Sequence, residues 1–406
     1  MSTKVFRAGT HRVRAPEETR ARIWPLLRAM GITRVANITG LDCIGIPVVA
    51  AYRPNARSLS VAQGKGASLV AAEVSGAMES IESYHAEHIV RPLLHASYNQ
   101  LRFSHPVLDP ELLPRSAVGR FSVDRKIHWI EGFDLIQHEP CWVPYELVHT
   151  DFTLPLPADS GCFPMSSNGL ASGNDLQEAI SHAICELVER DADALFALLS
   201  PEERAQRVLR LDTLAVAECE PLFALFAKAR VRVAVWNMTS DIGIAAFRAV
   251  IMDEELNPDR PLRPHVGMGC HPSRAIALAR ALTEAAQARL TVISSARDDL
   301  SRARYSEASD FDKLRALRAA ESARAPACTF SDVPEFESDD LGQDVSWETE
   351  RLVRSGVKHV VAVDLTKPEF GIPVVRVIAP GLEAPRDIPG WLPGKRARAL
   401  AARTEA

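Results

Sequence analysis

The 406-residue sequence has no run of about 18 apolar residues, the length that a membrane-spanning helix needs. Basic residues near the N-terminus are not followed by the apolar stretch of a signal peptide. The seven cysteines occur singly, with no C-x-x-C pair and no Cys/His spacing typical of zinc sites. These absences predict a reduced, cytoplasmic protein without a membrane segment.

Clustered positive charge is also scarce. The formal net charge is −5, and the basic stretch "GKRARALAAR" near the C-terminus is short. Proteins that bind nucleic acid phosphates need lysine and arginine gathered on one surface. The composition therefore gives no reason to expect a nucleic-acid partner.

The composition is that of a globular protein, with 47% hydrophobic and 24% charged residues. Chains of this length form one large domain or two, and we favour one. We expect a helix/strand segment at 1–60, the main domain at 61–385 and a tail at 386–406. Candidate linkers are 101–120, 298–345 and 380–406, which are polar or rich in proline.

Helical and strand patterns mix along the whole chain, which predicts an α/β (mixed α+β) fold. Helices are expected at 16–30, 67–90, 174–198, 272–297 and 346–356, and strands at 32–38, 46–52, 126–136, 141–149, 231–238, 244–252, 357–365 and 373–379. The strands at 231–238 and 244–252 read as central. Gly31 and Gly356 stand where two of the helices should end.

An acidic stripe marks the expected helix at 174–198. At about 100° per residue, Glu178, Glu186 and Glu189 fall within about 80° of one another, while apolar residues occupy the other side. Such a stripe either faces water or holds a cation. Taken alone, this helix favours the solvated alternative.

A second helix repeats the arrangement. Glu79 and Glu82 are three residues apart and are neighbours on one face. Shortly before them, Lys65 stands between glycines in "QGKGAS", and glycines let the backbone approach phosphate oxygens. The spacing of a P-loop is absent, so a solvated loop lysine is the alternative.

A third helix places Glu284 and Gln287 within about 60° of Arg280. Each helix alone is compatible with a polar surface. Three carboxylate-bearing helices together favour a cation, because clustered carboxylates repel one another and Mg²⁺ prefers oxygen ligands and phosphates. The sequence therefore predicts a site for Mg²⁺ and a nucleotide.

Three ordered blocks resemble the YcaO family: "QGKGASLVAAEVSGAMESIESYHAE", "SSNGLASGNDLQEAISHAICELVERDA" and "GMGCHPSRAIALARALTEAAQARL". The resemblance runs from about residue 61 to 385. The preceding "GITRVANITGLDCIGIPVVAAYRPNARSLSVAQGKG" is similar to the branch that works with a TfuA protein in thioamide formation. The family implies a YcaO-like fold, with mixed sheets surrounded by long helices.

The resemblance implies an enzyme that uses ATP and Mg²⁺ to activate a peptide backbone amide. In such enzymes a nucleophile adds to the amide carbon, and the amide oxygen leaves as phosphate. External sulfide gives a thioamide, whereas a Cys or Ser side chain gives an azoline. We expect a thioamide, with an azoline-forming cyclodehydratase as the alternative and a non-catalytic nucleotide-binding scaffold as a third reading.

The family's site residues carry over onto matching positions of this chain. Expected Mg²⁺ ligands are Glu79, Glu82, Glu186 and Glu189. Residues expected around the nucleotide are Lys65, Asn174, Glu178, Arg190, Glu284, Gln287 and Arg289. Glu82, Glu189 and Arg289 are expected to carry catalysis. Arg190 and Arg289 suit bidentate phosphate contacts, and structural pairing with a nearby carboxylate is the alternative for each.

Two departures from the cyclodehydratase branch affect the expected partners. The chain ends "DIPGWLPGKRARALAARTEA" rather than in a proline-rich tail, which weighs against azoline formation. No fused leader-binding domain is recognised before residue 61. The expected partners are a peptide or protein substrate, a TfuA-like protein and a separate leader-binding protein, and a homodimer is left open.

Overall fold

Helices cover antiparallel sheets in the computed structural model, which describes residues 2–404 apart from 116, 118, 215, 256–261, 300–326 and 389. The helices are α1 (Pro16–Ile23), α2 (Leu69–Glu87), α3 (Tyr98–Leu101), α4 (Leu176–Phe196), α5 (Pro201–Ala205), α6 (Glu220–Lys228), α7 (Arg274–Ser294), α10 (Leu341–Arg354) and α11 (Lys395–Thr404). None of these described helices is both long and apolar enough to cross a membrane.

The strands form three sheets. One has the order β1 (Arg34–Asn37), β2 (Val48–Tyr52), β3 (Val61–Lys65), and another the order β10 (His265–Cys270), β9 (Ala246–Asp253), β8 (Val231–Asn237). The six-stranded sheet has the order β4 (Leu93–Ala96), β5 (Ile127–Asp134), β11 (Val361–Asp364), β12 (Val374–Ile378), β7 (Leu170–Ser172), and β6 (Glu139–Pro144) also pairs with β5. Neighbouring strands pair antiparallel, as in β2 with β3 and β9 with β10.

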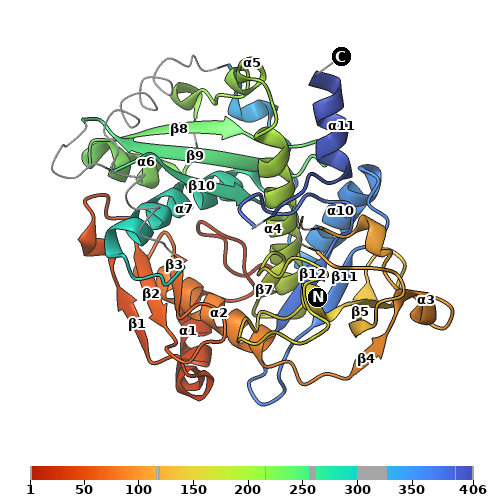
Figure 1. Ribbon diagram of the computed structural model, residues 1–406. Coiled ribbons are helices and arrows are strands. Elements are labelled where there is room, and N and C mark those ends of the chain that lie inside the picture. The colour runs from red at the N-terminus through yellow and green to blue at the C-terminus, as the bar shows by residue number, and fades with distance from the viewer. Residues whose placement is uncertain are drawn as a thin grey trace.

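Each sheet has a long helix of its own. Helix α2 packs on β2 and β3, α7 on β9 and β10, and α4 on β7 and β12. The three units meet because α2 also contacts β7, α7 contacts β3, and α4 contacts β10. In Figure 1, α4 crosses the middle of the molecule, between the β8–β10 sheet and the strands β11 and β12. These helix–strand contacts bring α2, α4 and α7 around a common central region.

The predicted fold class is confirmed, and the long helices lie where their periodicity placed them. The first expected helix changes to a 3-10 helix at Trp24–Met30, where Pro25 cannot donate a backbone hydrogen bond. It ends at Gly31, whose φ of 74° suits glycine. Helix α10 begins at Leu341, earlier than expected, because Asp340 caps it by accepting from the backbone N–H of Gly342.

The expected central strand at 231–238 and the candidate linker at 380–406 need correction. Strand β8 is an edge strand of its three-stranded sheet, whereas β9 is the central strand. The candidate linker at 380–406 contains α11, which contacts α4. Part of the candidate linker at 298–345, residues 300–326, lies outside the described residues. Strand β2 pairs with β3, so the segment expected at 1–60 contributes two strands to a sheet with the main domain.

The glycines that flank Lys65 pack the strand β3 against helix α2. A Cβ atom at Gly64 would lie 2.0 Å from the backbone nitrogen of Gly76 and 2.1 Å from the carbonyl oxygen of Ala72. A Cβ atom at Gly66 would lie 2.7 Å from that of Ala71. Helix α2 thus occupies the side of each glycine on which a Cβ atom would lie. These glycines are required by helix–strand packing.

We therefore expect Gly64→Ala to lower the free energy of unfolding by more than about 2 kcal/mol, because backbone atoms cannot move aside for the methyl group. The matched control is Gly40→Ala, where no atom lies within 4 Å of the added Cβ. Urea unfolding of both variants measures the difference. Equal midpoints for the two would contradict this account of the packing.

Candidate active site

The acidic stripe of α4 lies inside the protein. Asp175 caps the helix by accepting a hydrogen bond of 2.9 Å from the backbone N–H of Glu178. The exposed fraction is 3% for Glu178 and 7% for Glu189, and Glu186 is half-buried. The solvated alternative for this stripe is therefore wrong. Buried carboxylates need partners or cations, since desolvation penalises their charged form.

Strand β7 connects the acids of α2 with those of α4. The Glu82 carboxylate accepts hydrogen bonds from the Ser172 backbone N–H at 2.8 Å and from the Ser172 hydroxyl at 2.6 Å. Ser172 is the last residue of β7, and α4 begins at Leu176. Glu79, one helical turn before Glu82, is half-buried on the same helix. The strand thus places one acid of α2 beside the start of α4.

Helix α7 and strand β3 carry Lys65, Glu284 and Gln287, all expected around the nucleotide. The ammonium nitrogen of Lys65 lies 2.6 Å from a carboxylate oxygen of Glu284, whose other oxygen accepts from the backbone N–H of Met268 at 3.2 Å. The side-chain amide of Gln287 donates to the carbonyl oxygen of Gln63 at 2.7 Å. Lys65 and Glu284 therefore form a linked pair between the two sheets.

The charges of these groups act on one another. Burial raises the pKa of Glu82 to about 8 and that of Glu189 to about 7. Burial also raises the pKa of Glu79 and Glu186, and the charge of Glu186 raises the pKa of Glu79 further. Glu284 differs, because Lys65 and Arg190 outweigh the effect of burial and lower its pKa. The structure thus brings Glu186 within electrostatic reach of the other three expected metal ligands, Glu79, Glu82 and Glu189.

Two arginines face these acids, and one of them was not predicted. A guanidinium nitrogen of Arg190 lies 3.6 Å from the Glu189 carboxylate. Arg376 on β12 is 3% exposed and donates to the carbonyl oxygen of Ser166 at 2.7 Å. Two of its nitrogens have no hydrogen-bond partner among the described residues. Burial lowers the pKa of Arg376 to about 10, although the charge of Glu186 acts in the opposite direction. The available signal was one arginine within the apolar strand "VVRVI".

The donor set fits Mg²⁺ only together with a phosphate ligand. Within the described ranges, no three carboxylate, imidazole or thiol groups are arranged to hold a metal ion by themselves. Mg²⁺ commonly takes one or two carboxylates and completes its six-fold coordination with phosphate oxygens and water. Glu186 lies within electrostatic reach of Arg376, two of whose nitrogens have no hydrogen-bond partner among the described residues, and this combination of carboxylate and unpaired donors matches that requirement.

The remaining expected residues divide into two places. Asn174 and Glu178 lie together, since the Asn174 side-chain amide donates to the Glu178 carboxylate at 3.1 Å. Arg289 is held elsewhere, fully buried, with its guanidinium 2.9 Å from a carboxylate oxygen of Asp42 and 2.9 Å from one of Asp253. The structure does not bring Arg289 into contact with the acids of α2 and α4. Its contacts are those of a structural ion pair.

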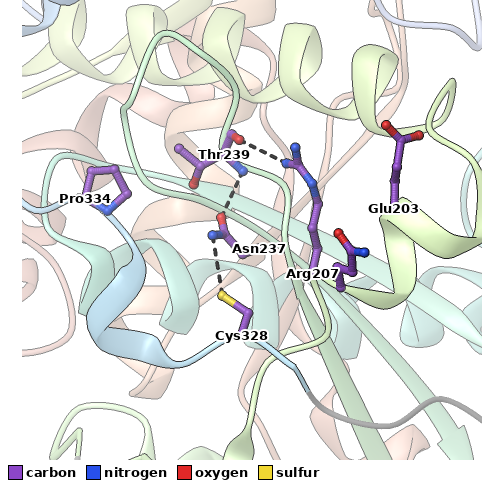
Figure 2. A pocket seen from close by; sticks show the side chains of 7 residues that line it. Glu203, Arg207, Asn237, Thr239, Cys328 and Pro334 are labelled. Atoms are coloured by element: carbon purple, nitrogen blue, oxygen red, sulfur yellow. Dashed lines mark hydrogen bonds between the residues drawn. The ribbon is translucent and has the colours of Figure 1, made fainter. Parts of the chain in front are cut away.

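A separate pocket of about 490 Å³ lies beside β8 (Figure 2). Its lining residues are Glu203, Gln206, Arg207, Asn237, Thr239, Cys328 and Pro334. Arg207 donates to the Thr239 carbonyl oxygen at 3.2 Å, and the Asn237 amide donates to the Cys328 sulfur at 3.7 Å. Burial raises the pKa of the Cys328 thiol. Arg207 and Thr239, and Asn237 and Cys328, are thus hydrogen-bonded to each other, and no lining residue is an expected site residue.

An α/β fold whose helices surround buried carboxylates defines an acidic, phosphate-compatible site. The family model described as YcaO cyclodehydratase, ATP- and Mg²⁺-binding, matches residues 63–383, and the chain belongs to the YcaO family. ATP and Mg²⁺ are the ligands by which that family is described, as the sequence predicted.

Two curated relatives extend over nearly the whole chain. One, from Rhizobium leguminosarum bv. trifolii, is called an uncharacterized protein in the tfuA 3′ region; it is 38% identical over 92% of this chain and 89% of its own length. An uncharacterized protein of Methanothermobacter thermautotrophicus is 35% identical over 91% of this chain and 94% of its own. The first is consistent with the predicted TfuA-associated branch.

Solved structures share the fold. A YcaO protein from Methanopyrus kandleri, bound with AMPPCP and Mg²⁺, aligns with a TM-score of 0.72 at 24% identity, over 94% of this chain and 95% of that one. A heterocyclase in complex with substrate and cofactor aligns with a TM-score of 0.76 at 24% identity and covers 94% of this chain. This chain spans 53% of that heterocyclase.

The placement of Arg289 generates a stability prediction. We expect Arg289→Gln to lower the free energy of unfolding by about 3–5 kcal/mol, because the buried Asp42 carboxylate and the partly buried Asp253 carboxylate lose their partner. The control is Arg354→Gln, which removes an exposed pair with Glu350 and should change stability by less than about 1 kcal/mol. Urea unfolding compares the two. An Arg289→Gln variant as stable as its control would show that the pair contributes nothing.

The raised pKa of Glu82 predicts a pH dependence in the ligand-free protein. Between its ordinary value of 4.5 and about 8, the folded state binds the proton that the unfolded state has lost. Stability should therefore fall as pH rises through this window, and Glu82→Gln should reduce that slope. Unfolding midpoints measured at several pH values test this, with Glu18→Gln on the exposed face of α1 as control. Identical slopes for wild type and Glu82→Gln would refute the expected shift.

Proposed function

We propose that this protein uses ATP and Mg²⁺ to activate a peptide backbone amide, and that the product is a thioamide. The observation that carries the first part is the set of four carboxylates on α2 and α4 whose pKa burial raises. Such groups repel one another unless a cation lies among them. The YcaO family is described by the ligands that would supply it.

In this proposal Glu79, Glu82, Glu186 and Glu189 would hold Mg²⁺ on the phosphates of ATP. Bound Mg²⁺ and ATP supply a transferable phosphoryl group whose charge the metal partly neutralises. Ser172 orients Glu82 through two hydrogen bonds, which leave its second oxygen free for a ligand. Arg190 and Arg376 place positive charge at the α4 side of the same space. The catalytic contribution of Glu82 and Glu189 would then be to position Mg²⁺ and the phosphates of ATP.

The residues of α7 and β3 would bind the nucleotide from the opposite side. Lys65 is paired with Glu284, and that pair can open toward phosphate because both side chains keep about a quarter of their surface exposed, 25% and 23%. Gln287 is anchored to β3 and Asn174 to Glu178. Arg289 is left with a structural role in this proposal, since two aspartates already hold it.

The proposed reaction balances with sulfide as the second substrate. The sulfur atom forms a bond to the amide carbon, and the amide oxygen forms a bond to the terminal phosphorus of ATP. The carbon–oxygen bond then breaks, phosphate carries the oxygen away, and ADP is the other product. The name of the relative in the tfuA 3′ region supports a TfuA-like protein as the partner. A separate leader-binding protein remains part of the proposal.

The amide activation is tested by ADP release in the presence of Mg²⁺, substrate peptide and the partner protein. We expect Glu82→Gln and Glu189→Gln each to lower the turnover rate at least about a hundredfold, because each removes a charge opposite the metal. Glu18→Gln, on the exposed face of α1, is the matched control. Wild-type turnover in both site variants would refute the metal assignment.

The same reaction decides the product. Mass spectrometry of the peptide distinguishes exchange of oxygen for sulfur, which gives the thioamide, from loss of one water, which gives the azoline. The family's description as cyclodehydratases favours the azoline as second candidate. ATP binding without any change in the peptide would instead support a non-catalytic scaffold.

A further inference from the structure

We propose that His95 and His128 form a second metal site, for a borderline divalent cation such as Zn²⁺, and that Asp159 orients His128 for this role. The two histidines lie on β4 and β5, whereas the acids of α2 and α4 lie beside β7, at the other end of the strand order of the same sheet. None of the three residues was expected at a site from the sequence. The proposal does not depend on the proposed amide activation.

Strand pairing places the two imidazoles side by side. His95 on β4 is the direct antiparallel partner of His128 on β5. Directly opposite residues of adjacent strands project from the same face of a sheet, with Cβ atoms about 4.5–5.5 Å apart. The two rings lie 4.8 Å apart between their centroids, with an angle of 35° between their planes. The backbone of the sheet therefore fixes their separation.

This separation is the one that a shared metal ion requires. Zinc–nitrogen bonds are about 2.0–2.1 Å long, so two imidazoles bound to one ion at angles between about 90° and 109° have centroids about 4.5–5.2 Å apart. The observed 4.8 Å lies within that range. Because the terminal torsion of histidine is soft, each ring can turn a nitrogen toward a common point without movement of the strands.

Asp159 holds His128 as a metal-binding histidine is usually held. One of its carboxylate oxygens lies 2.7 Å from Nδ1 of His128 and also accepts from the His128 backbone N–H at 3.0 Å. Histidines that bind metals commonly donate from their second ring nitrogen to a carboxylate, which fixes the tautomer and makes the first nitrogen a stronger ligand. Nε2 of His128 is thereby left as the nitrogen that would bind the ion.

The nitrogens that would bind the ion are accessible. Within the part of the chain that the structure describes, neither Nε2 of His128 nor a ring nitrogen of His95 makes a hydrogen bond to the protein. His95 is exposed, and the His128 side chain keeps 41% of its surface exposed. An ion can therefore reach both rings from solvent.

The ligand set determines which cation fits. Among the described residues, no third imidazole, thiol or carboxylate joins the pair as a ligand, so water would complete the coordination. Imidazole suits Zn²⁺, Cu²⁺ and Ni²⁺, whereas Mg²⁺ prefers oxygen ligands. The pair therefore selects a different cation from the acids of α2 and α4.

A bound ion would brace one edge of the six-stranded sheet. Strand β4 stands at the end of the strand order and pairs with β5. The loop that carries Asp159 is held by Glu146, which accepts from the backbone N–H groups of Cys162 and Phe163 at 2.9 Å each. An ion on both histidines would join β4 to β5 and, through Asp159, to this loop. Its expected role is structural.

Titration calorimetry of the intact chain with ZnCl₂ tests the proposal, in buffer with excess Mg²⁺ and without nucleotide. We expect His95→Ala to weaken the binding of one equivalent of Zn²⁺ at least about tenfold, because a single imidazole remains. Asp159→Asn should weaken the same binding about tenfold to a hundredfold, the usual effect of losing the carboxylate behind a metal-binding histidine. The matched control is His105→Ala, an exposed histidine outside the pair, which should bind as wild type does.

Two results would overturn the proposal. One is equal affinity and stoichiometry for Zn²⁺ in wild type and His95→Ala; the exposed Cys43 is present in both, so binding there cancels in the comparison. The other is binding to wild type weaker than about 1 mM, a free energy of about 4 kcal/mol. Since the titration uses no ATP, peptide or partner, neither result bears on amide activation, which ADP release tests separately.

Thermal unfolding gives a second readout. An ion that binds the folded state raises its unfolding midpoint. Zn²⁺ should therefore raise the midpoint of wild type and His105→Ala more than that of His95→Ala, whose exposed side chain leaves the core unchanged. Equal shifts in all three proteins would also overturn the proposal.

Discussion

The repulsion among carboxylates that are held away from bulk water is the constraint on which this structure depends. Helices α2 and α4 carry four of them, and burial raises the pKa of each. A protein does not keep such a set without compensation, because every buried charge costs free energy unless it is paired. The fold supplies part of that compensation through Lys65, Arg190 and Arg376. The remainder is left for a ligand that carries its own cation.

The three-sheet architecture explains how acids from distant parts of the chain meet. Each long helix packs on its own sheet and also contacts a strand of a second sheet, which brings α2, α4 and α7 around the same central region. Glycines at the strand–helix contacts bring the backbones unusually close, as Gly64 does between β3 and α2. That close approach places Lys65, one residue later, within 2.6 Å of Glu284 on a different helix. The packing of strands against helices therefore also sets the positions of the site residues.

Periodicity in the sequence was enough to locate the long helices and the acids on them, because a helix of twenty residues repeats its pattern several times. It could not tell whether the acidic stripe of α4 faced water, since that depends on what packs against it. Strands such as β10, with two glycines in "HVGMGC", carry little local signal and exist because α7 accepts their close approach. Arg289 matched the family pattern, yet its partner Asp42 is 247 residues away in the chain.

The position of the N-terminal residues also could not be predicted from the sequence pattern. Their sequence has basic residues and a glycine but no periodic pattern, which is typical of an unstructured terminus. What orders them is charge: Lys4 finds a buried aspartate on α10, and Val13 and Arg12 meet a buried glutamate on α4. A segment that neutralises interior acids in this way cannot be recognised until those acids are known to be interior. The acidic interior thus determines the place of the N-terminus, as it determines the place of the nucleotide in our proposal.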